Sequence, residues 1–182
     1  MIMKRLSFIL LLASLAAILH AAPTPETTAT TNPTSIAVYF SPDGGCTRAI
    51  VAELKKARSN ILVQAYSFTS APIAKALIEA HKRGVQVRAI LDKSQVTEKY
   101  SSADLLAHSD IPVLIDWEHA IAHNKVMIID GEVVITGSFN FTKAAEEKNA
   151  ENLLVIRDVV LAGKYADNWQ IHAAHSKPYE GQ

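Results

Sequence analysis

Residues 123–140 read HNKVMIIDGEVVITGSFN, and this stretch decides the fold. Two apolar, largely β-branched runs, residues 126–129 and 133–135, flank Asp130-Gly131-Glu132. Asp-Gly between such runs is typical of a hairpin with a type I′ turn, in which both central residues have a positive φ. We therefore predict two antiparallel strands. Their continuous apolar character indicates that both faces of the hairpin are buried.

Polar side chains stand at the open end of this predicted hairpin. His123 and Lys125 share one face of an extended chain and lie roughly 6 to 7 Å apart along it. Ser138 and Asn140 repeat the same spacing on the neighbouring strand. An imidazole, an ammonium, a hydroxyl and an amide on one patch suit a phosphodiester, because an acid–base group or nucleophile then lies among donors to the phosphoryl oxygens.

The pattern His-x-Lys-x4-Asp-x6-Gly-Ser-x-Asn resembles the signature of the phospholipase D superfamily, which residues 123–140 match without a gap. The similarity extends over roughly residues 35–177 and includes the segments 64–69 and 84–92. A single motif in a short exported chain is similar to the small bacterial EDTA-resistant endonucleases of that superfamily. The resemblance implies a phospholipase D-like nuclease fold and a reaction at a phosphodiester.

Four residues of the motif carry the predicted phosphate chemistry. His123 is the nucleophile or the general acid, and Lys125 clamps the phosphate. Ser138 and Asn140 donate to the same oxygens, while Gly137 allows close approach of the backbone.

Two carboxylates complete the candidate catalytic set. Asp130 belongs to the family motif, but an aspartate before glycine in a hairpin is explained by turn chemistry, so we assign it a structural role within that set. By resemblance, Glu151 holds a histidine in the correct tautomer, either in its own subunit or across a dimer. The alternative for Glu151 is a solvated glutamate at a strand end.

A single motif supplies one imidazole. Displacement through a covalent intermediate needs a nucleophile on one side of phosphorus and a proton donor on the other. We therefore predict a two-fold homodimer in which two copies of His123 share one site. One copy forms a phosphohistidine, and the other protonates the leaving oxygen and then activates water.

Candidate metal ligands lie before the motif and at its first residue, at Asp116, Glu118, His119 and His123. The spacing of the two histidines suits a helix, whereas this segment leads into a strand. The charge of Lys125 also disfavours a neighbouring cation. We predict a site without metal or cofactor, and we place His172 and His175 at the surface of the last helix.

The N-terminus has the pattern of a secretory signal peptide over residues 1–22. Lys4 and Arg5 precede an apolar run over residues 6–19, and small residues follow at Ala21 and Ala22. The run is short for a membrane span, although an uncleaved anchor is the alternative. Residues 23–35 are rich in Pro and Thr and predict a flexible linker before the nuclease domain, residues 36–177. We expect a periplasmic or secreted protein without stable membrane association.

Charge and cysteine content add little to this prediction. Loss of residues 1–22 removes Lys4 and Arg5, so 18 basic and 18 acidic residues become 16 and 18, a formal charge of −2. A basic face can exist despite such a balance. Cys46 is the single cysteine, which excludes an intrachain disulfide, and we interpret it as a small buried hydrophobe.

Alternating patterns predict the remaining elements. Strands are expected at residues 36–40, 61–66, 85–91, 112–115 and 152–156, and helices at residues 47–58, 71–83, 103–108, 142–148 and 159–174. Gly84 follows the second helix, where a C-cap glycine belongs, and the tail after Ser176 is expected to be loose. This order predicts an α/β domain, a mixed β-sheet flanked by helices on both faces.

These features together predict a metal-independent phosphodiesterase that acts as a nonspecific endonuclease on DNA or RNA. No base-reading element such as a recognition helix is evident. One alternative is a phospholipase D or phosphatidyltransferase acting on lipid phosphodiesters, although the mature sequence lacks a strongly amphipathic surface segment. A nucleic-acid-binding module without catalysis is disfavoured, because binding needs no inward imidazole with an orienting carboxylate.

Overall fold

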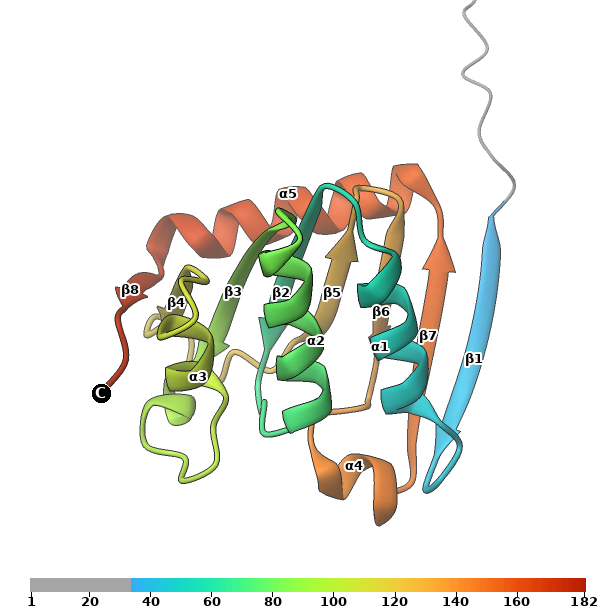
Figure 1. Ribbon diagram of the computed structural model, residues 1–182, viewed down its shortest axis with the longest axis horizontal. Coiled ribbons are helices and arrows are strands. Elements are labelled where there is room, and N and C mark those ends of the chain that lie inside the picture. Colours follow the sequence, from blue (N-terminus) through green and yellow to red (C-terminus); the bar gives the residue numbers. More distant parts are fainter. Residues whose placement is uncertain (1–33) are drawn as a thin grey trace, which may run out of the picture. The chain divides into compact units, whose positions relative to one another are not determined.

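A mixed β-sheet of eight strands organises the protein, in the order β1-β7-β6-β5-β2-β3-β4-β8 (Figure 1). The computed structural model describes residues 34–182, so the predicted signal peptide and most of the predicted linker lie outside the described residues. The strands are β1 (Ser35–Ser41), β2 (Asn60–Ala65), β3 (Gln86–Asp92), β4 (Val113–Asp116), β5 (Lys125–Ile129), β6 (Val133–Gly137), β7 (Glu151–Arg157) and β8 (Lys177–Tyr179).

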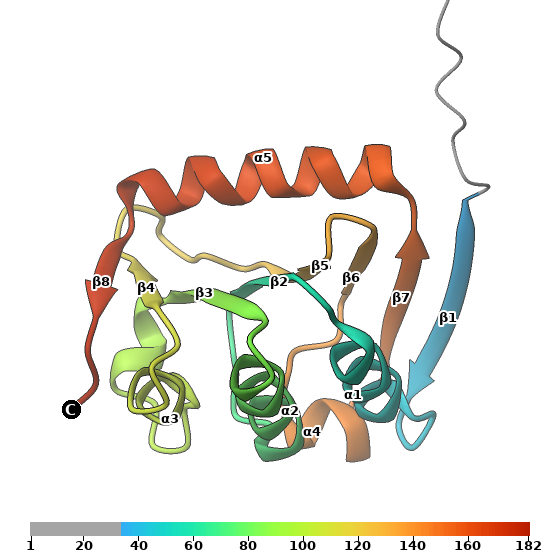
Figure 2. The same ribbon diagram turned by 45° about the horizontal axis from the view of Figure 1, so that its top comes forward.

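Helices cover both faces of this sheet, as the sequence predicts. The helices are α1 (Cys46–Lys56), α2 (Ala71–Lys82), α3 (Ala103–Ala107), α4 (Lys143–Glu147) and α5 (Val159–His175), with a short 3-10 helix η1 (Lys93–Val96). Figure 2 shows α5 crossing one face while α1, α2 and α3 pack on the other. Within residues 34–182, no helix combines the length and the apolar character that a membrane crossing requires.

Two apolar layers hold the helices against the sheet. The larger layer lies beneath α1 and α2, where Ile50, Leu54, Ile73 and Leu77 are fully buried. The smaller layer lies under α5, where Trp169 is fully buried and its indole nitrogen donates to the carbonyl of Val63 at 2.8 Å. Because both faces of the sheet are covered, every residue of β5 is buried, as its continuous apolar sequence predicts.

Strand directions bring several loops to one edge of the sheet. Strands β2, β3 and β4 run parallel, whereas β5 runs antiparallel to β2 and pairs Lys125 with Ala65. The carboxyl ends of β2, β3 and β4 therefore meet the beginning of β5. Strand β6 ends and β7 begins at this same edge, and α4 connects them there (Figure 1).

The predicted hairpin is confirmed. Asp130 and Gly131 have φ values of 55° and 66°, so both central residues occupy the left-handed region that a type I′ turn requires. Strands β5 and β6 pair antiparallel on either side, from Ile129 opposite Val133 to Met127 opposite Ile135. This turn lies at the end of β5 opposite to Lys125.

The expectation of a loose tail after Ser176 is wrong. Strand β8 pairs antiparallel with β4, and the hydroxyl of Tyr179 donates to Asp104 at 2.6 Å. Pairing with β8 covers the outer edge of β4, which would otherwise expose unpaired backbone groups. Three residues that include Pro178 carry no strand signal in the sequence, because proline is depleted in strands and the run is short.

Candidate active site

A cleft of about 460 Å³ opens at the sheet edge where β5 begins and β6 ends. Its lining consists of His123, Lys125, Gly137, Ser138, Asn140 and Glu151. The structure thus brings together six predicted residues from three neighbouring segments of the sheet edge. Asp130 is the one member of the predicted set that lies elsewhere.

Most of these side chains lie just beyond the strand ends rather than on the strands themselves. His123 precedes β5, and Ser138 and Asn140 follow β6, which ends at Gly137. The chain leaves the sheet there because the amides of residues 138 and 139 both donate to the carbonyl of Asn152, at 3.1 and 3.2 Å. The expected alternation of these residues on two paired strands is therefore wrong, although their convergence is confirmed.

Gly137 permits this exit from the sheet. Its φ is 144°, and a Cβ atom at this position would collide with the carbonyl oxygen of Asn152. The close approach predicted for Gly137 is therefore an approach to strand β7. The substrate is not needed to explain this glycine.

Lys125 places a buried ammonium group at the floor of the cleft. Its Nζ donates to the carbonyl of His123 at 2.9 Å and lies 5.2 Å from the centre of the Tyr66 ring. Burial removes water from the charge and lowers the pKa of Lys125, while the negative charge of Glu151 acts in the opposite direction. A poorly hydrated cation of this kind is well suited to pair with a phosphoryl oxygen.

Tyr66 supports the imidazole of His123 and had no predicted role. The two rings lie 4.7 Å apart between centroids and are tilted by 52°. The amide of Tyr66 also donates to the carbonyl of Asn124 at 2.8 Å, which fixes the segment before β5. The sequence could have indicated a role for Tyr66, because this residue directly follows the buried strand β2 and ligand sites of α/β sheets lie at the carboxyl ends of parallel strands.

Ser138 and Asn140 form the opposite wall of the cleft. The Ser138 hydroxyl oxygen accepts hydrogen bonds from the backbone and side-chain nitrogens of Asn152, at 3.1 and 3.3 Å. Its own hydrogen therefore stays available as a donor. The Oδ1 atom of Asn140 is buried and has no hydrogen-bond partner among residues 34–182.

Asp130 lies at the opposite end of β5 and binds the backbone instead of the cleft. Its carboxylate accepts hydrogen bonds from the amides of Arg58, Ser59 and Asn60, at 2.8 to 3.2 Å, and from the Ser59 hydroxyl at 2.9 Å. Burial would raise the pKa of Asp130, but these donors outweigh it and lower the pKa below its usual value. This geometry agrees with the structural role that turn chemistry predicts.

Glu151 is the first residue of β7 and lines the cleft on the side of Lys125. Its carboxylate accepts a hydrogen bond from the side chain of Asn149 at 3.1 Å. Within the described part of the chain it makes no hydrogen bond to His123. Control of a histidine tautomer by Glu151 stays a prediction, in its own subunit or across a dimer.

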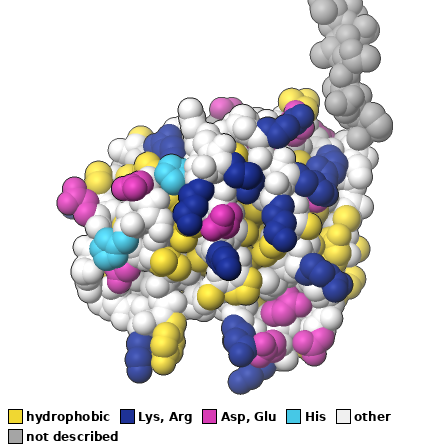
Figure 3. Space-filling model, in the orientation of Figure 1, with side chains coloured by type: hydrophobic (Ala, Val, Ile, Leu, Met, Phe, Trp, Pro, Cys, Tyr) yellow, Lys and Arg dark blue, Asp and Glu magenta, His cyan; other side chains and the backbone are white. Residues whose placement is uncertain are grey.

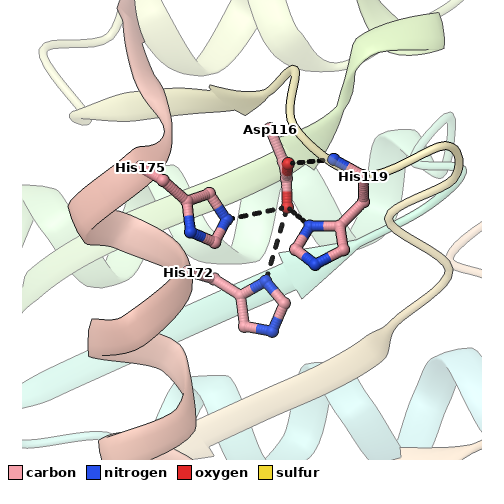
Figure 4. Close-up of side chains that lie close together, drawn as sticks. All are labelled: Asp116, His119, His172 and His175. Carbon is pink, nitrogen blue, oxygen red and sulfur yellow. Dashed lines mark hydrogen bonds and ion pairs between the residues drawn. The ribbon is translucent and has the colours of Figure 1, made fainter.

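The proposed surface position of the last-helix histidines is wrong. His172 and His175 are only 16% and 22% exposed, and both rings point at Asp116, as does His119 (Figure 4). Helix α5 packs along the sheet and ends beside β4, and this contact covers the two rings. His123 does not belong to this group, and Glu118 contributes a backbone amide to Asp116.

Comparisons with known proteins identify a family and relatives of this chain. A family model described as the PLD-like domain of cardiolipin synthase matches residues 50–171. Phospholipase D of Rickettsia conorii is 48% identical over 134 residues, which cover 74% of this chain and 67% of that protein. Mitochondrial cardiolipin hydrolase of Xenopus laevis is 31% identical over 121 residues, and the match spans 58% of its length and 66% of this chain.

A solved structure has a similar fold. The phospholipase D family member Nuc from Salmonella typhimurium superposes with a TM-score of 0.79 at 39% sequence identity. The match covers 82% of this chain and 100% of that chain.

Proposed function

This chain belongs to the phospholipase D superfamily of phosphodiesterases, and we propose that it is a nonspecific endonuclease. The observation that carries the proposal is the lining of the cleft, which contains one glycine and five polar or charged side chains. A nucleic-acid backbone presents only phosphate and sugar oxygens to such a surface. An apolar wall for acyl chains is absent from the cleft lining among residues 34–182.

Exposed cations on α1 and α2 support a polyanionic substrate. Figure 3 shows Lys and Arg side chains spread over the face that these helices form. The exposed residues there include Arg48, Lys55, Lys56, Lys75, Lys82 and Arg83, although Lys56 and Lys82 pair with glutamates of their own helices. Contacts of such cations with phosphates release counterions, so cleavage of DNA should weaken as salt rises.

The proposed reaction uses one His123 as nucleophile. Its ring nitrogen attacks phosphorus and forms a P–N bond, while the ester P–O bond breaks and the leaving oxygen takes a proton from the partner subunit's His123. That second imidazole then removes a proton from water, which attacks phosphorus and breaks the P–N bond. Lys125 and Asn140 stabilise the charge on the phosphoryl oxygens throughout, without a metal ion.

A homodimer supplies the second imidazole in this proposal. The cleft of one chain contains one histidine. An apolar strip on β1 ends beside this cleft. Ile36, Val38 and Phe40 form that strip and are 62%, 50% and 64% exposed. The next residue along β1, Ser41, pairs with Glu151 of the cleft. Contact between two such strips would cover apolar surface and bring two clefts together.

Plasmid degradation in excess EDTA tests the endonuclease proposal. We expect the wild-type chain to degrade the plasmid and His123→Ala to lose activity by about 10³-fold or more. His108→Ala is the matched control, because His108 is exposed and lies outside the cleft. Complete loss of wild-type cleavage in EDTA while the protein stays folded by circular dichroism, with recovery on a divalent ion, would refute the metal-independent scheme.

The lipid alternative has a specific observation in its favour. The matching proteins from Rickettsia conorii and Xenopus laevis are called phospholipase D and mitochondrial cardiolipin hydrolase. We therefore compare release of acid-soluble nucleotides from DNA with release of choline from phosphatidylcholine micelles. Faster turnover of the lipid than of DNA would replace our proposal with this alternative.

Mixed dimers test the shared site. Heterodimers of wild type and His123→Asn, isolated through two different affinity tags, should lose nearly all turnover because each shared site needs two imidazoles. Retention of half or more of the native turnover would show that each subunit acts alone.

The location of the protein is a separate proposal, based on the signal-peptide pattern of residues 1–22. We propose export to the periplasm or the medium with cleavage near Ala21 or Ala22. Mass spectrometry of the exported protein tests this, and a mass that includes Met1 would contradict it.

A further inference from the structure

Four potential metal ligands converge where the end of α5 meets β4 (Figure 4). Asp116 is the last residue of β4, His119 lies in the following loop, and His172 and His175 lie in the last turn of α5. One ligand atom from each residue lies within 4.8 Å of all the others. Three of the seven histidines of the chain therefore meet at one carboxylate.

The two oxygens of Asp116 have different environments. Oδ1 accepts hydrogen bonds from the amides of Glu118 and His119, at 3.0 and 3.2 Å. These amides fix the carboxylate and turn Oδ2 toward the three imidazoles. The side chain of Asp116 is fully buried.

Three imidazole nitrogens surround the single atom Oδ2. Nδ1 of His119 lies at 2.8 Å, Nδ1 of His172 at 3.4 Å and Nε2 of His175 at 3.5 Å. A carboxylate oxygen offers about two lone-pair directions, so three rings exceed what hydrogen bonding to this atom can satisfy. A cation placed among the four ligand atoms would satisfy all three rings and the carboxylate together.

The distances from Oδ2 to the three ring nitrogens suit zinc. Bonds of 2.0 to 2.2 Å in a tetrahedral zinc site place neighbouring ligand atoms about 3.3 to 3.6 Å apart. Two of the three distances to Oδ2 already have that value, and the third has to open by about 0.5 Å. Three imidazole nitrogens and one carboxylate oxygen also form a donor set that zinc accepts.

We propose that Asp116, His119, His172 and His175 bind one zinc ion as four protein ligands. A closed set of four ligands is typical of a structural site, because no position stays open for water or substrate. The ion would join the last turn of α5 to the end of β4 and to the loop that leads to His123. Zinc would therefore stabilise the support of the cleft without taking part in the reaction.

Contacts around the ligands hold the proposed site in place. The hydroxyl of Ser176 donates to the carbonyl of His172 at 2.8 Å and closes the end of α5. Nζ of Lys93 donates to the carbonyl of His119 at 2.9 Å and fixes the loop. Such outer contacts orient ligands before the metal arrives.

Zinc titration of the full chain tests the proposal without any nucleic acid. The protein is purified without a polyhistidine tag, stripped with a chelator and titrated with zinc chloride in a calorimeter. We expect one zinc ion per chain and a rise in Tm of about 5 to 10 °C at a free zinc concentration 100 times Kd.

Two ligand variants and one control locate the ion. His175→Gln and His119→Gln should each weaken zinc binding by more than about 100-fold, since loss of even an outer-shell partner costs up to about that factor. His119 is 44% exposed, so its variant should fold even if His175→Gln does not. His108→Gln should bind like the wild type. Absence of binding at 1 mM zinc (about 1,000 times a micromolar Kd), or unchanged affinity in both ligand variants, would overturn the proposal.

Discussion

Replacement of Asp130 by alanine separates a structural role from a catalytic one at this motif position. The Asp130 carboxylate accepts hydrogen bonds from three backbone amides and one hydroxyl of residues 58–60, which lead from α1 into the start of β2. It lies outside the cleft that contains His123. We therefore expect Asp130→Ala to lower the free energy of unfolding and to leave kcat of the folded enzyme nearly unchanged.

The magnitude follows from these contacts. Hydrogen bonds to a charged group contribute about 1.5 to 3 kcal/mol each. In the variant, the exposed amides bind water instead of Asp130, which offsets part of this loss. The Asp130 side chain is 10% exposed, whereas the segment that it binds is largely exposed. Alanine also tolerates a φ of 55° less well than aspartate, at a cost of about 1 kcal/mol. Together these effects predict a loss of about 3 to 4 kcal/mol.

Urea unfolding of wild type and variant measures this loss, and Glu132→Ala serves as the control. Glu132 lies in the same hairpin turn, but its side chain is 55% exposed and it pairs with Arg58 at the surface. We expect a change below about 1 kcal/mol for the control. A loss below 1 kcal/mol for Asp130→Ala, or a fall of 100-fold or more in kcat at full folding, would refute our assignment.

The same variant makes a prediction about pH. The pKa of Asp130 is lower in the folded protein than in the unfolded chain, so its ionised form stabilises the fold. Its contribution is fully present above the unfolded pKa, about 4, and is lost as the pH falls through the lower folded value. The stability difference between wild type and Asp130→Ala should therefore be constant from about pH 5 to 7 and shrink below about pH 4.

Three further changes have defined outcomes. Gly137→Ala should lower the free energy of unfolding by about 2 to 4 kcal/mol in urea titrations, because the new Cβ would strike the backbone of β7. Its control, Gly163→Ala, has open space around it on α5 and should stabilise the protein by up to about 1 kcal/mol. Lys125→Met should lower kcat/KM for a nitrophenyl phosphodiester by about 10² to 10³. Lys143→Met, on the exposed face of α4, should leave kcat/KM unchanged. Equal effects of the two changes would contradict the assignment of Lys125 to phosphate binding. Burial raises the pKa of the Cys46 thiol to about 11. Iodoacetamide at pH 8 should therefore react more than about 100-fold slower with the native protein than with the protein unfolded in urea. Fast labelling of the native protein would instead show an accessible thiol.

Elements that depend on local sequence were predictable. The Asp130-Gly131 turn requires only neighbouring residues to adopt positive φ, and both do. The alternating strands and helices follow from apolar periodicity, so each of them except β8 and the short η1 was predicted to within a few residues. The motif spacing likewise predicted that His123, Lys125 and Asn140 would converge, because a hairpin joins their segments directly.

Contacts between distant segments were decided by the tertiary structure alone. The sequence by itself determined the hairpin, the α/β order and the family of the site, because these depend on residues close in the chain. Strand β8, the partners of Asp130 and the meeting of His119 with His172 instead depend on how α5 crosses the sheet and where strands end. For segments separated by 50 to 70 residues, no fixed spacing in the sequence indicates which residues will meet. Only packing of the whole domain brings their side chains within hydrogen-bond distance.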